Sequence, residues 1–234
     1  MKKKLIVLLI IVFVIMLCLL FYYKYYEYKY ININNIDIPN VEIDADKASY
    51  FFDLDKYIDE YKNDQIIGLI TIMDTDFSML FAQSDDNSYY LDHLLNHEYN
   101  KLGSTFLDYR VDIDNSRKIN IYGHNNNDVG VSFNYIMNYE NKSFFDKYDK
   151  IYIYTKDTSY VYEVFSVQIV DSNYIHMKVD FNNDYEFYDY LDNVLANSIY
   201  YREINYDEVS RVLTLQTCTN RKDLEYLLVN ARLI

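Results

Sequence analysis

Cys218 and His124 are the two residues whose types and positions indicate chemistry. Cys218 ends the apolar, β-branched run Arg211–Cys218 (RVLTLQTC), and His124 ends a second strand-like run, Ile119–His124 (INIYGH). A cysteine thiolate is a nucleophile and a histidine imidazole carries protons, so the pair suits covalent acyl transfer through a thioester. Both runs have the composition of β-strands. Two strands that end at the same edge of a sheet would bring the thiol and the imidazole to one groove.

The redox state of Cys218 depends on where the chain resides. The sequence contains two cysteines, and the other, Cys18, lies within an N-terminal hydrophobic run. The two cannot pair within one chain, and no disulfide framework is predicted. A lone thiol in an oxidising exterior is either buried and inert or kept for its reactivity. The strand context of Cys218 and His124 favours the reactive alternative.

The N-terminus predicts a membrane anchor. Lys2–Lys4 precede the run Leu5–Tyr23, which contains no charged residue, glycine or proline. At about 1.5 Å per residue, this run just crosses a bilayer core of about 30 Å. It ends in interfacial tyrosines and offers no small-x-small cleavage site, so we expect a retained signal-anchor. The lysines predict a cytoplasmic N-terminus, one pass through the cell membrane at residues 5–23, and an extracellular remainder. A soluble protein that buries this helix is the alternative.

The net charge disfavours some partners. The formal net charge is −14, and five lysines and one glutamate give residues 1–30 a local +4, so the remainder carries −18. Such an acidic chain disfavours nucleic acid as a partner. The acidic residues are scattered, with no calcium-binding loop pattern. His93 and His97 have the spacing of half a zinc site, but no further ligand cluster accompanies them, and no metal or cofactor is predicted. His176 is expected to be a surface residue without a role.

Hydrophobic patterning predicts a mainly-β domain. Helical spacing is expected in 44–62, 131–139 and 184–199, and a short helix or turn in 87–96. Because these helices do not alternate regularly with strands, a barrel or sandwich is favoured over a βαβ sheet. Eight segments rich in Ile, Val, Tyr and Thr are strand candidates: 65–73, 78–82, 103–109, 118–124, 150–155, 160–170, 211–218 and 226–233.

The length of the chain suits one folded domain behind the anchor. About 200 residues follow the hydrophobic run, enough for a domain of ordinary size with its own core. We therefore divide the chain into the lysines and signal-anchor at 1–23, a juxtamembrane tether at 24–44 and an extracellular domain at 45–234.

Five segments of the sequence form a recognisable series: Asn87–Leu91 (NSYYL), Gly103–Arg110 (GSTFLDYR), Ile121–His124 (IYGH), Asn173–Ile175 (NYI) and Thr214–Cys218 (TLQTC). In this order, behind a signal-anchor, they resemble the class B sortases, which are cysteine transpeptidases of Gram-positive cell surfaces. The match covers about residues 45–234. The resemblance implies an eight-stranded β-barrel with an N-terminal helix and peripheral inserted helices.

The resemblance also implies a mechanism and partners. The Cys218 thiolate attacks the carbonyl of a threonine in a C-terminal sorting signal of a surface protein, and His124 protonates the departing amine. A thioester results. An amine of peptidoglycan, or of its lipid-linked precursor, then attacks the thioester, so the protein is attached to the cell wall without ATP. The signal itself would be of a kind such as N-P-Q-T-N or P-x-T-G.

One family position differs in this chain. Sortases carry an arginine at the start of the last strand, and aligning the family pattern on Leu227–Ile234 places Tyr226 there. Tyr226 could donate its phenolic O–H to the oxyanion, a weaker interaction than a charge-assisted one. Arg221, in the loop after Cys218, is the fallback for the arginine role.

The same carry-over gives the substrate-binding residues. They are Asn87, Leu91, Tyr174, Ile175, Gln216 and Thr217. Gln216 replaces the serine usual in that strand, which would alter preference if its side chain touches the substrate. Asn125 could orient His124, although a role in the turn after the strand is the simpler reading.

Two other functions remain open. A degenerate sortase could serve as a membrane-anchored peptide-binding protein, which the missing arginine favours. A Cys/His cell-wall hydrolase would share the compartment and the nucleophile, but known hydrolases of that kind place the cysteine before the histidine, whereas here His124 precedes Cys218.

Overall fold

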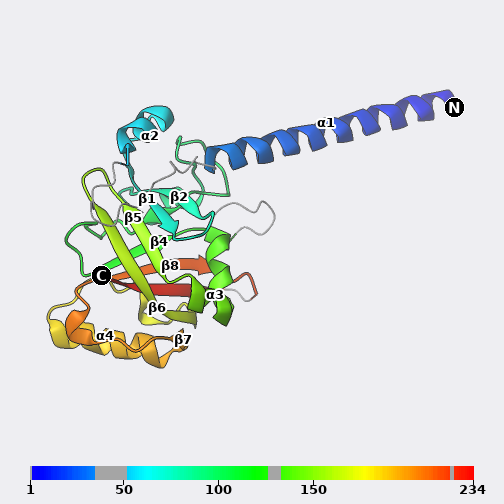
Figure 1. The fold of residues 1–234 in the computed structure, drawn as a ribbon. Coiled ribbons are helices and arrows are strands. Elements are labelled where there is room, and N and C mark those ends of the chain that lie inside the picture. Colours follow the sequence, from blue (N-terminus) through cyan, green and yellow to red (C-terminus); the bar gives the residue numbers. More distant parts are fainter. Residues whose placement is uncertain (1, 35–51, 126–132, 222–223) are drawn as a thin grey trace. The chain divides into compact units, whose positions relative to one another are not determined.

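The computed structural model describes residues 2–34, 52–125, 133–221 and 224–234, which fall into the two units Met1–Asp37 and Ile38–Ile234. The described part of the first unit is one helix, α1 (Lys2–Asn34) (Figure 1). Its segment Ile6–Tyr26 is long and apolar enough to cross a membrane, by length and composition. The helix continues beyond the predicted span at 5–23, so the tether predicted at 24–44 begins in a helix. The remainder of that tether lies outside the described residues.

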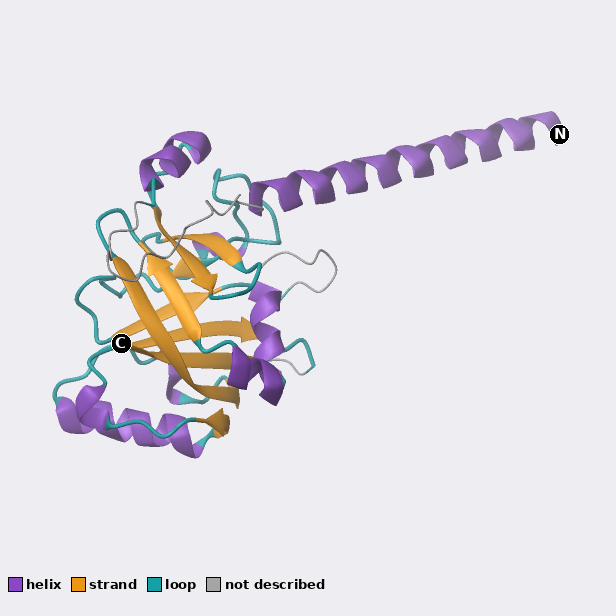
Figure 2. Ribbon diagram, in the orientation of Figure 1, coloured by secondary structure: helices purple, strands orange, loops and turns teal. Residues whose placement is uncertain are grey.

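The second unit is built around a closed β-barrel. Its strands pair in the order β5-β1-β2-β3-β4-β8-β9-β6, and a further pairing of β6 with β5 closes a ring of eight, which confirms the predicted barrel (Figures 1 and 2). A ninth strand, β7, extends the sheet beside β6. The strands are β1 (Ile66–Ile72), β2 (Ser78–Ala82), β3 (Phe106–Leu107), β4 (Lys118–Tyr122), β5 (Lys150–Tyr154), β6 (Ser159–Asp171), β7 (Ser198–Tyr201), β8 (Val212–Cys218) and β9 (Glu225–Leu233).

The helices lie around the barrel (Figure 2). The predicted helix at 44–62 is α2 over its second half, where Asp53 caps the first turn by accepting a hydrogen bond from the Lys56 backbone N–H; residues 44–51 lie outside the described part of the chain. Of the helix predicted at 131–139, the part from Phe133 is a 3-10 helix that continues to Glu140, and residues 131 and 132 lie outside the described part of the chain. The elements are α2 (Leu54–Tyr61), α3 (Lys142–Lys147), α4 (Asp184–Ala196) and the 3-10 helices η1 (Tyr89–Leu91), η2 (Phe133–Glu140), η3 (Ile175–Met177) and η4 (Tyr206–Glu208).

The prediction of one helix over 184–199 is wrong at its end. The helix α4 stops at Ala196, and Ser198–Tyr201 form β7 on the edge of β6. Ser198 bridges the two elements, because its hydroxyl donates to the Val194 carbonyl at 2.7 Å and lies 2.7 Å from the hydroxyl of Ser166 on β6. The short β-branched and aromatic run therefore pairs with a strand instead of extending the helix.

Both faces of the central strands are covered. In β8, Leu213 and Leu215 point into the barrel core, whereas Val212 belongs to a second apolar cluster with α4. The alternation follows from the two-residue period of a strand. Each such buried aliphatic side chain contributes about 1.5–3 kcal/mol relative to exposure. The packing of α4 on the outer face therefore explains why residues on both faces of β8 are buried.

Register places the ends of β4 and β8 together. The two strands are parallel neighbours, with Ile119 opposite Leu213 and Tyr122 opposite Gln216. Parallel strands end at the same edge of the sheet, so Cys218, the last residue of β8, and His124, two residues beyond β4, lie at one edge. Strand β9 runs antiparallel to β8 and begins at that edge.

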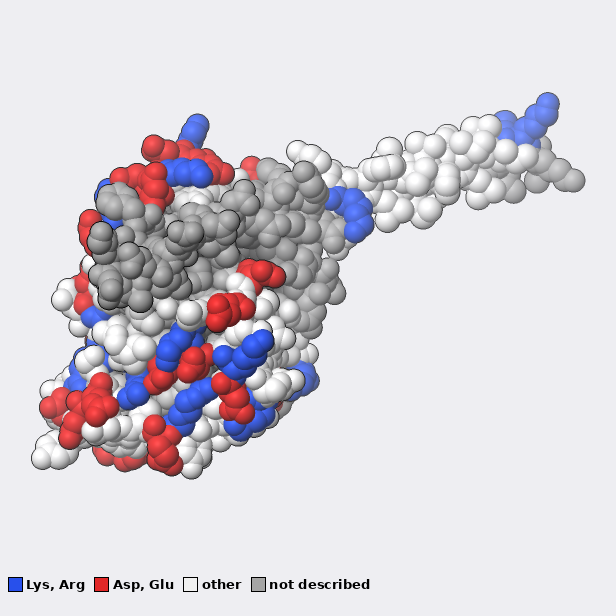
Figure 3. All heavy atoms as spheres, in the orientation of Figure 1, with Lys and Arg blue, Asp and Glu red and all other residues white. Residues whose placement is uncertain are grey.

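The acidic excess is distributed over the outer surface. Figure 3 shows acidic side chains over α2 and α4, with basic and acidic side chains interleaved across the barrel face between them. On that face Glu163 pairs with both Lys150 and Arg232, at 2.6 and 2.8 Å.

Candidate active site

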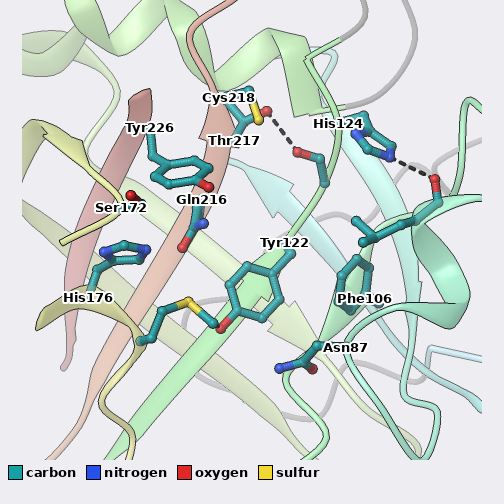
Figure 4. A pocket seen from close by; sticks show the side chains of 13 residues that line it. Asn87, Phe106, Tyr122, His124, Ser172, His176, Gln216, Thr217, Cys218 and Tyr226 are labelled. Atoms are coloured by element: carbon teal, nitrogen blue, oxygen red, sulfur yellow. Dashed lines mark hydrogen bonds between the residues drawn. The ribbon is translucent and has the colours of Figure 1, made fainter. Parts of the chain in front are cut away.

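A cavity of about 420 Å³ lies beside the ends of β4 and β8 and the start of β9. Figure 4 shows side chains converging on it from these strands and from the segment before α4. Among its described lining residues there is no Asp, Glu, Lys or Arg side chain. The cavity is therefore an apolar and amide-lined space on a domain of high negative charge. Its lining residues are Asn87, Leu91, Phe106, Tyr122, Gly123, His124, Ser172, His176, Met177, Gln216, Thr217, Cys218 and Tyr226.

Cys218, the candidate nucleophile, is a free, half-buried thiol at the end of β8. Burial raises the pKa of this thiol above its ordinary value of 9.0. The resting group at neutral pH is therefore the protonated thiol, and a partner must remove its proton for attack. The Cys218 carbonyl accepts a hydrogen bond from Asn125 Nδ2 at 2.7 Å, so Asn125 contacts the cysteine strand rather than the ring of His124.

His124, the candidate proton carrier, is oriented by a backbone group. Its Nε2 lies 2.7 Å from the carbonyl oxygen of Leu91 (Figure 4). A carbonyl only accepts, so Nε2 is the donor, and Nδ1 is the ring nitrogen that carries the lone pair when the ring is neutral. The strand end before it is tied to β8, because the Thr217 hydroxyl donates to the Gly123 carbonyl at 2.7 Å.

Packing explains why the residue before His124, Gly123, is a glycine. A Cβ at Gly123 would lie 2.7 Å from Cγ of Phe133 on η2, closer than real Cβ contacts. Phe133 is fully buried, so it has no room to withdraw. Glycine therefore lets η2 pack against the strand end that presents His124.

Tyr226 lies directly opposite Cys218 in the antiparallel ladder of β8 and β9. The next pair outward is hydrogen-bonded, since the Thr219 N–H donates to the Glu225 carbonyl at 3.0 Å. Bonded and non-bonded pairs alternate, so Cys218 and Tyr226 form a non-bonded pair, whose side chains approach closely. Burial and the neighbouring Cys218 raise the pKa of Tyr226, which therefore remains a phenol and a donor. Its hydroxyl points into the cavity in Figure 4.

Arg221, the predicted alternative for the arginine role, is held by two carboxylates. Its guanidinium pairs with Glu140 at 2.8 Å and with Glu225 at 3.4 Å, and its side chain is half exposed. It is not among the described residues that line the cavity. To serve the arginine role, it would have to leave both carboxylates.

The predicted substrate-binding residues divide into two groups. Asn87, Leu91, Gln216 and Thr217 line the cavity, whereas Tyr174 and Ile175 are not among its described lining residues. The Tyr174 hydroxyl is directed at α4, where it donates to the Asn193 carbonyl at 3.0 Å. Ile175 is exposed at the start of η3. The Oε1 atom of Gln216 is buried and has no hydrogen-bond partner among the described residues.

Six lining residues were not among the predicted site residues: Phe106, Tyr122, Gly123, Ser172, His176 and Met177. The expectation that His176 lies at the surface is wrong, because only 2% of the residue is exposed. Its ring lies between those of Tyr174 and Tyr226, with centroid distances of 6.2 and 5.3 Å. Burial, with the nearby charge of Lys118, lowers the pKa of His176 to about 4, so it is neutral at physiological pH. The only sequence signal was its place next to Asn173–Ile175.

Comparisons with known proteins agree with this architecture. The sortase domain family matches residues 81–234. The sortase B of Listeria monocytogenes is 33% identical over 164 residues, and that of Staphylococcus aureus is 28% identical over 157 residues. These matches cover 70% and 67% of this chain, but 66% and 64% of the relatives, just under two thirds of their length. The crystal structure of Clostridium perfringens sortase B superimposes with a TM-score of 0.70 at 26% identity, covering 77% of this chain and 99% of that one.

The chain belongs to the sortase family, and within that family to class B. The barrel, with its N-terminal helix and peripheral helices, is the fold of those structures.

Proposed function

We propose that the chain is a cysteine transpeptidase that cleaves a C-terminal sorting signal after threonine and transfers the protein to a peptidoglycan amine. The observation that carries this proposal is the meeting of Cys218 and His124 at the ends of two adjacent parallel strands, on one cavity. Family membership supports the same reaction class.

In the proposed first step, the Cys218 thiol passes its proton to Nδ1 of His124 as sulfur attacks the threonine carbonyl. A C–S bond forms, and the carbonyl electrons move to oxygen. When the intermediate collapses, the C–N bond breaks and the histidine proton goes to the departing amine. The raised pKa of the thiol makes this transfer necessary, because little thiolate exists at rest.

In the second step the incoming amine attacks the thioester, and His124 accepts its proton. The new C–N bond replaces the C–S bond, and Cys218 regains its proton. The acceptor is an amine of peptidoglycan or of its lipid-linked precursor. We place this reaction outside the cell, with residues 5–23 as the membrane anchor, 24–44 as the tether and 45–234 as the catalytic domain.

We assign stabilisation of the oxyanion to the hydroxyl of Tyr226. The backbone N–H that directly follows the nucleophile, on Thr219, already donates within the ladder, which leaves it turned away from the cavity. The Tyr226 hydroxyl is a neutral donor on the cavity side of Cys218. Neutral donors stabilise an oxyanion less than a guanidinium does, so a slower acylation step is expected than with arginine at this position.

A second candidate function is peptide binding without turnover. The tyrosine at the arginine position favours it, because the chain would then keep a signal-binding cavity and lose most of its oxyanion stabilisation.

Product analysis separates these functions. The full chain in detergent micelles is incubated with fluorogenic sorting-signal peptides and an excess of an acceptor amine such as triglycine. A ligated product supports transpeptidation, and cleavage that yields only the free acid indicates a hydrolase. Saturable peptide binding without either product would indicate the degenerate binding protein. The matched control is Cys218→Ala, which should bind peptide and form no product.

A further inference from the structure

The backbone of η3 is bound by three side chains, of which Lys118 is fully buried and Arg110 has a side chain that is 34% exposed. Lys118 Nζ donates to the carbonyls of both His176 and Lys178, the second at 2.9 Å. Arg110 Nη2 donates to the carbonyl between them, on Met177, at 2.8 Å. Asn120 Nδ2 adds a bond to the His176 carbonyl at 3.2 Å. Three consecutive carbonyls are thus held by three side chains, Lys118, Arg110 and Asn120, which we call the carbonyl clamp.

The clamp lies in an unusual place for charge. Lys118 is 0% exposed, and its Nζ lies 4.8 Å from the ring centre of Tyr190 on α4. Burial lowers the pKa of Lys118 to about 7 despite the nearby carboxylate of Asp108. Lysine is almost never fully buried without compensation. The polar groups around Lys118 must therefore compensate its burial.

The partners of Asp108 show why Lys118 depends on the carbonyls of η3. Asp108 is fully buried and is already bonded to Arg110 at 2.6 Å and to the Tyr122 hydroxyl at 2.7 Å. Asp108 is therefore already occupied, and the Lys118 amine depends on the carbonyls of His176 and Lys178 as acceptors. Moving η3 away would leave this fully buried amine without those hydrogen-bond partners. These hydrogen bonds therefore restrict the movement of η3.

The restrained segment, η3, forms one wall of the candidate active site. His176 and Met177 line the cavity, and their backbone is the part that the clamp binds. Met177 is fixed a second time, by the contact of its sulfur with the Tyr122 hydroxyl at 3.6 Å. Figure 4 shows His176 and Tyr122 on opposite sides of Gln216.

One strand positions both sides of this cavity. Lys118, Asn120 and Tyr122 alternate along β4 and share its outer face, while Ile119 and Ile121 point into the core. The same strand leads directly to His124. The distance between the candidate proton carrier and the η3 wall is therefore set by β4.

We propose that Lys118 and Arg110 are positioning residues that hold the His176–Met177 wall at a fixed distance from β4 and so preorganise the cavity for the peptide. The proposal rests on the proposed function for its effect on turnover. A preformed wall lowers the ordering cost of binding, so its loss weakens peptide binding more than it slows chemistry at Cys218.

The principal variant is Lys118→Met, which keeps a long apolar side chain in the buried space and removes the donors and the charge. Arg117→Met is the matched control, because Arg117 is the adjacent cation, contacts α4 through Asp184 at 2.7 Å and takes no part in the clamp. Asn120→Ala, which removes one donor to the His176 carbonyl, is the milder second variant if Lys118→Met does not fold. All are made in the full chain in detergent micelles.

Two measurements are compared. Hydrogen exchange of the ligand-free protein should become at least about tenfold faster for the amides of 172–180 in Lys118→Met, with the barrel strands and Arg117→Met unchanged. For the sorting-signal peptide that the wild type turns over, KM should rise about tenfold or more while kcat changes less than about threefold. Asn120→Ala should show both effects in the same direction and smaller.

The proposal is overturned if exchange at 172–180 is unchanged, if it accelerates throughout the barrel, or if the local change leaves KM as it was. The exchange arm needs no substrate, so a wild type without peptide turnover would contradict the proposed function alone. In that case, binding of the same peptides to wild type and Lys118→Met decides the effect on the cavity, and equal affinity overturns the proposal.

Discussion

Cys218 and Tyr226 face each other across a non-bonded pair of the β8–β9 ladder, at the cavity edge where the strand that leads to His124 also ends. In this arrangement a phenol stands beside the thiol, at the position that the family pattern predicts to be an arginine. In the proposed reaction the oxyanion would form beside this pair.

Replacing Tyr226 tests its assigned role as oxyanion donor. Tyr226→Phe keeps the ring and removes the hydroxyl, so the single-turnover acylation rate should fall about 100-fold or more, since loss of one oxyanion-hole donor typically costs about 100- to 1,000-fold. Tyr226→Arg should restore a charged donor and raise the rate above that of the wild type. An unchanged acylation rate in Tyr226→Phe would remove the phenol from the mechanism.

Arg221 provides the complementary test. Its guanidinium is held by Glu140 and Glu225, so Arg221→Ala should change the acylation rate by less than about twofold. Stopped-flow or quenched-flow acylation of the same peptide measures this directly. A loss as large as that of Tyr226→Phe would mean that Arg221 leaves its carboxylates to serve the oxyanion.

The burial of Cys218 predicts its reactivity with pH. Because burial raises the thiol pKa above 9.0, alkylation by iodoacetamide should be slow at pH 7 and should still be rising at pH 9. The measurement uses Cys18→Ser, which leaves Cys218 as the one thiol of the chain. A rate that reaches its plateau between pH 7 and 8 would show that a thiolate–imidazolium pair already exists at rest.

Lys118 should give stability an unusual pH dependence. Its pKa is about 7 in the folded protein, below the ordinary 10.5, so between these values the unfolded chain binds more protons. The free energy of unfolding from this group therefore rises as pH increases from about 7 towards 10.5 and is lost as pH falls towards 7. Urea unfolding of wild type and Lys118→Met at pH 6.5, 8 and 9 isolates this effect. A constant difference between the two proteins across that range would contradict it.

Gly123 should tolerate no side chain. The Cβ in Gly123→Ala would meet Phe133 at 2.7 Å, and overpacking of this kind costs about 1–3 kcal/mol of unfolding free energy. Thermal or urea unfolding measures the loss, and the combined Gly123→Ala, Phe133→Leu variant should recover part of it. An alanine variant as stable as the wild type would show that η2 can shift.

Sequence patterns located the longer barrel strands because these are runs rich in β-branched or aromatic residues, as in Arg211–Cys218. Shorter elements were missed where their state depends on a distant partner. Strand β7 exists through its pairing with β6, and the six-residue helix α3 begins at Asn141, which caps it by accepting from the Ser143 N–H at 2.9 Å. Neither has enough residues for a period to be visible.

Sequence motifs predicted the site residues that belong to them, but not the residues that tertiary packing brings to the cavity. Cys218, His124 and Tyr226 follow from strand ends and family order, and all three line the cavity. The burial of His176 was not predicted, because its contacts come from residues distant in sequence, such as Lys118, 58 residues away, which donates to its carbonyl. The alternation of Lys118, Asn120 and Tyr122 with apolar residues marks an outer face, but α4 and η3, which cover it, are non-local.

The proposed function requires that Cys218 form a thioester with a sorting signal. Intact mass spectrometry of the full chain in detergent, after incubation with a pool of sorting-signal peptides, detects this adduct. We expect an added mass equal to the peptide portion that ends in threonine, absent in Cys218→Ala and released when an acceptor amine is added. An alkylatable Cys218 that acquires no adduct from any peptide in the pool, while the chain still binds those peptides, would rule out the proposed thioester.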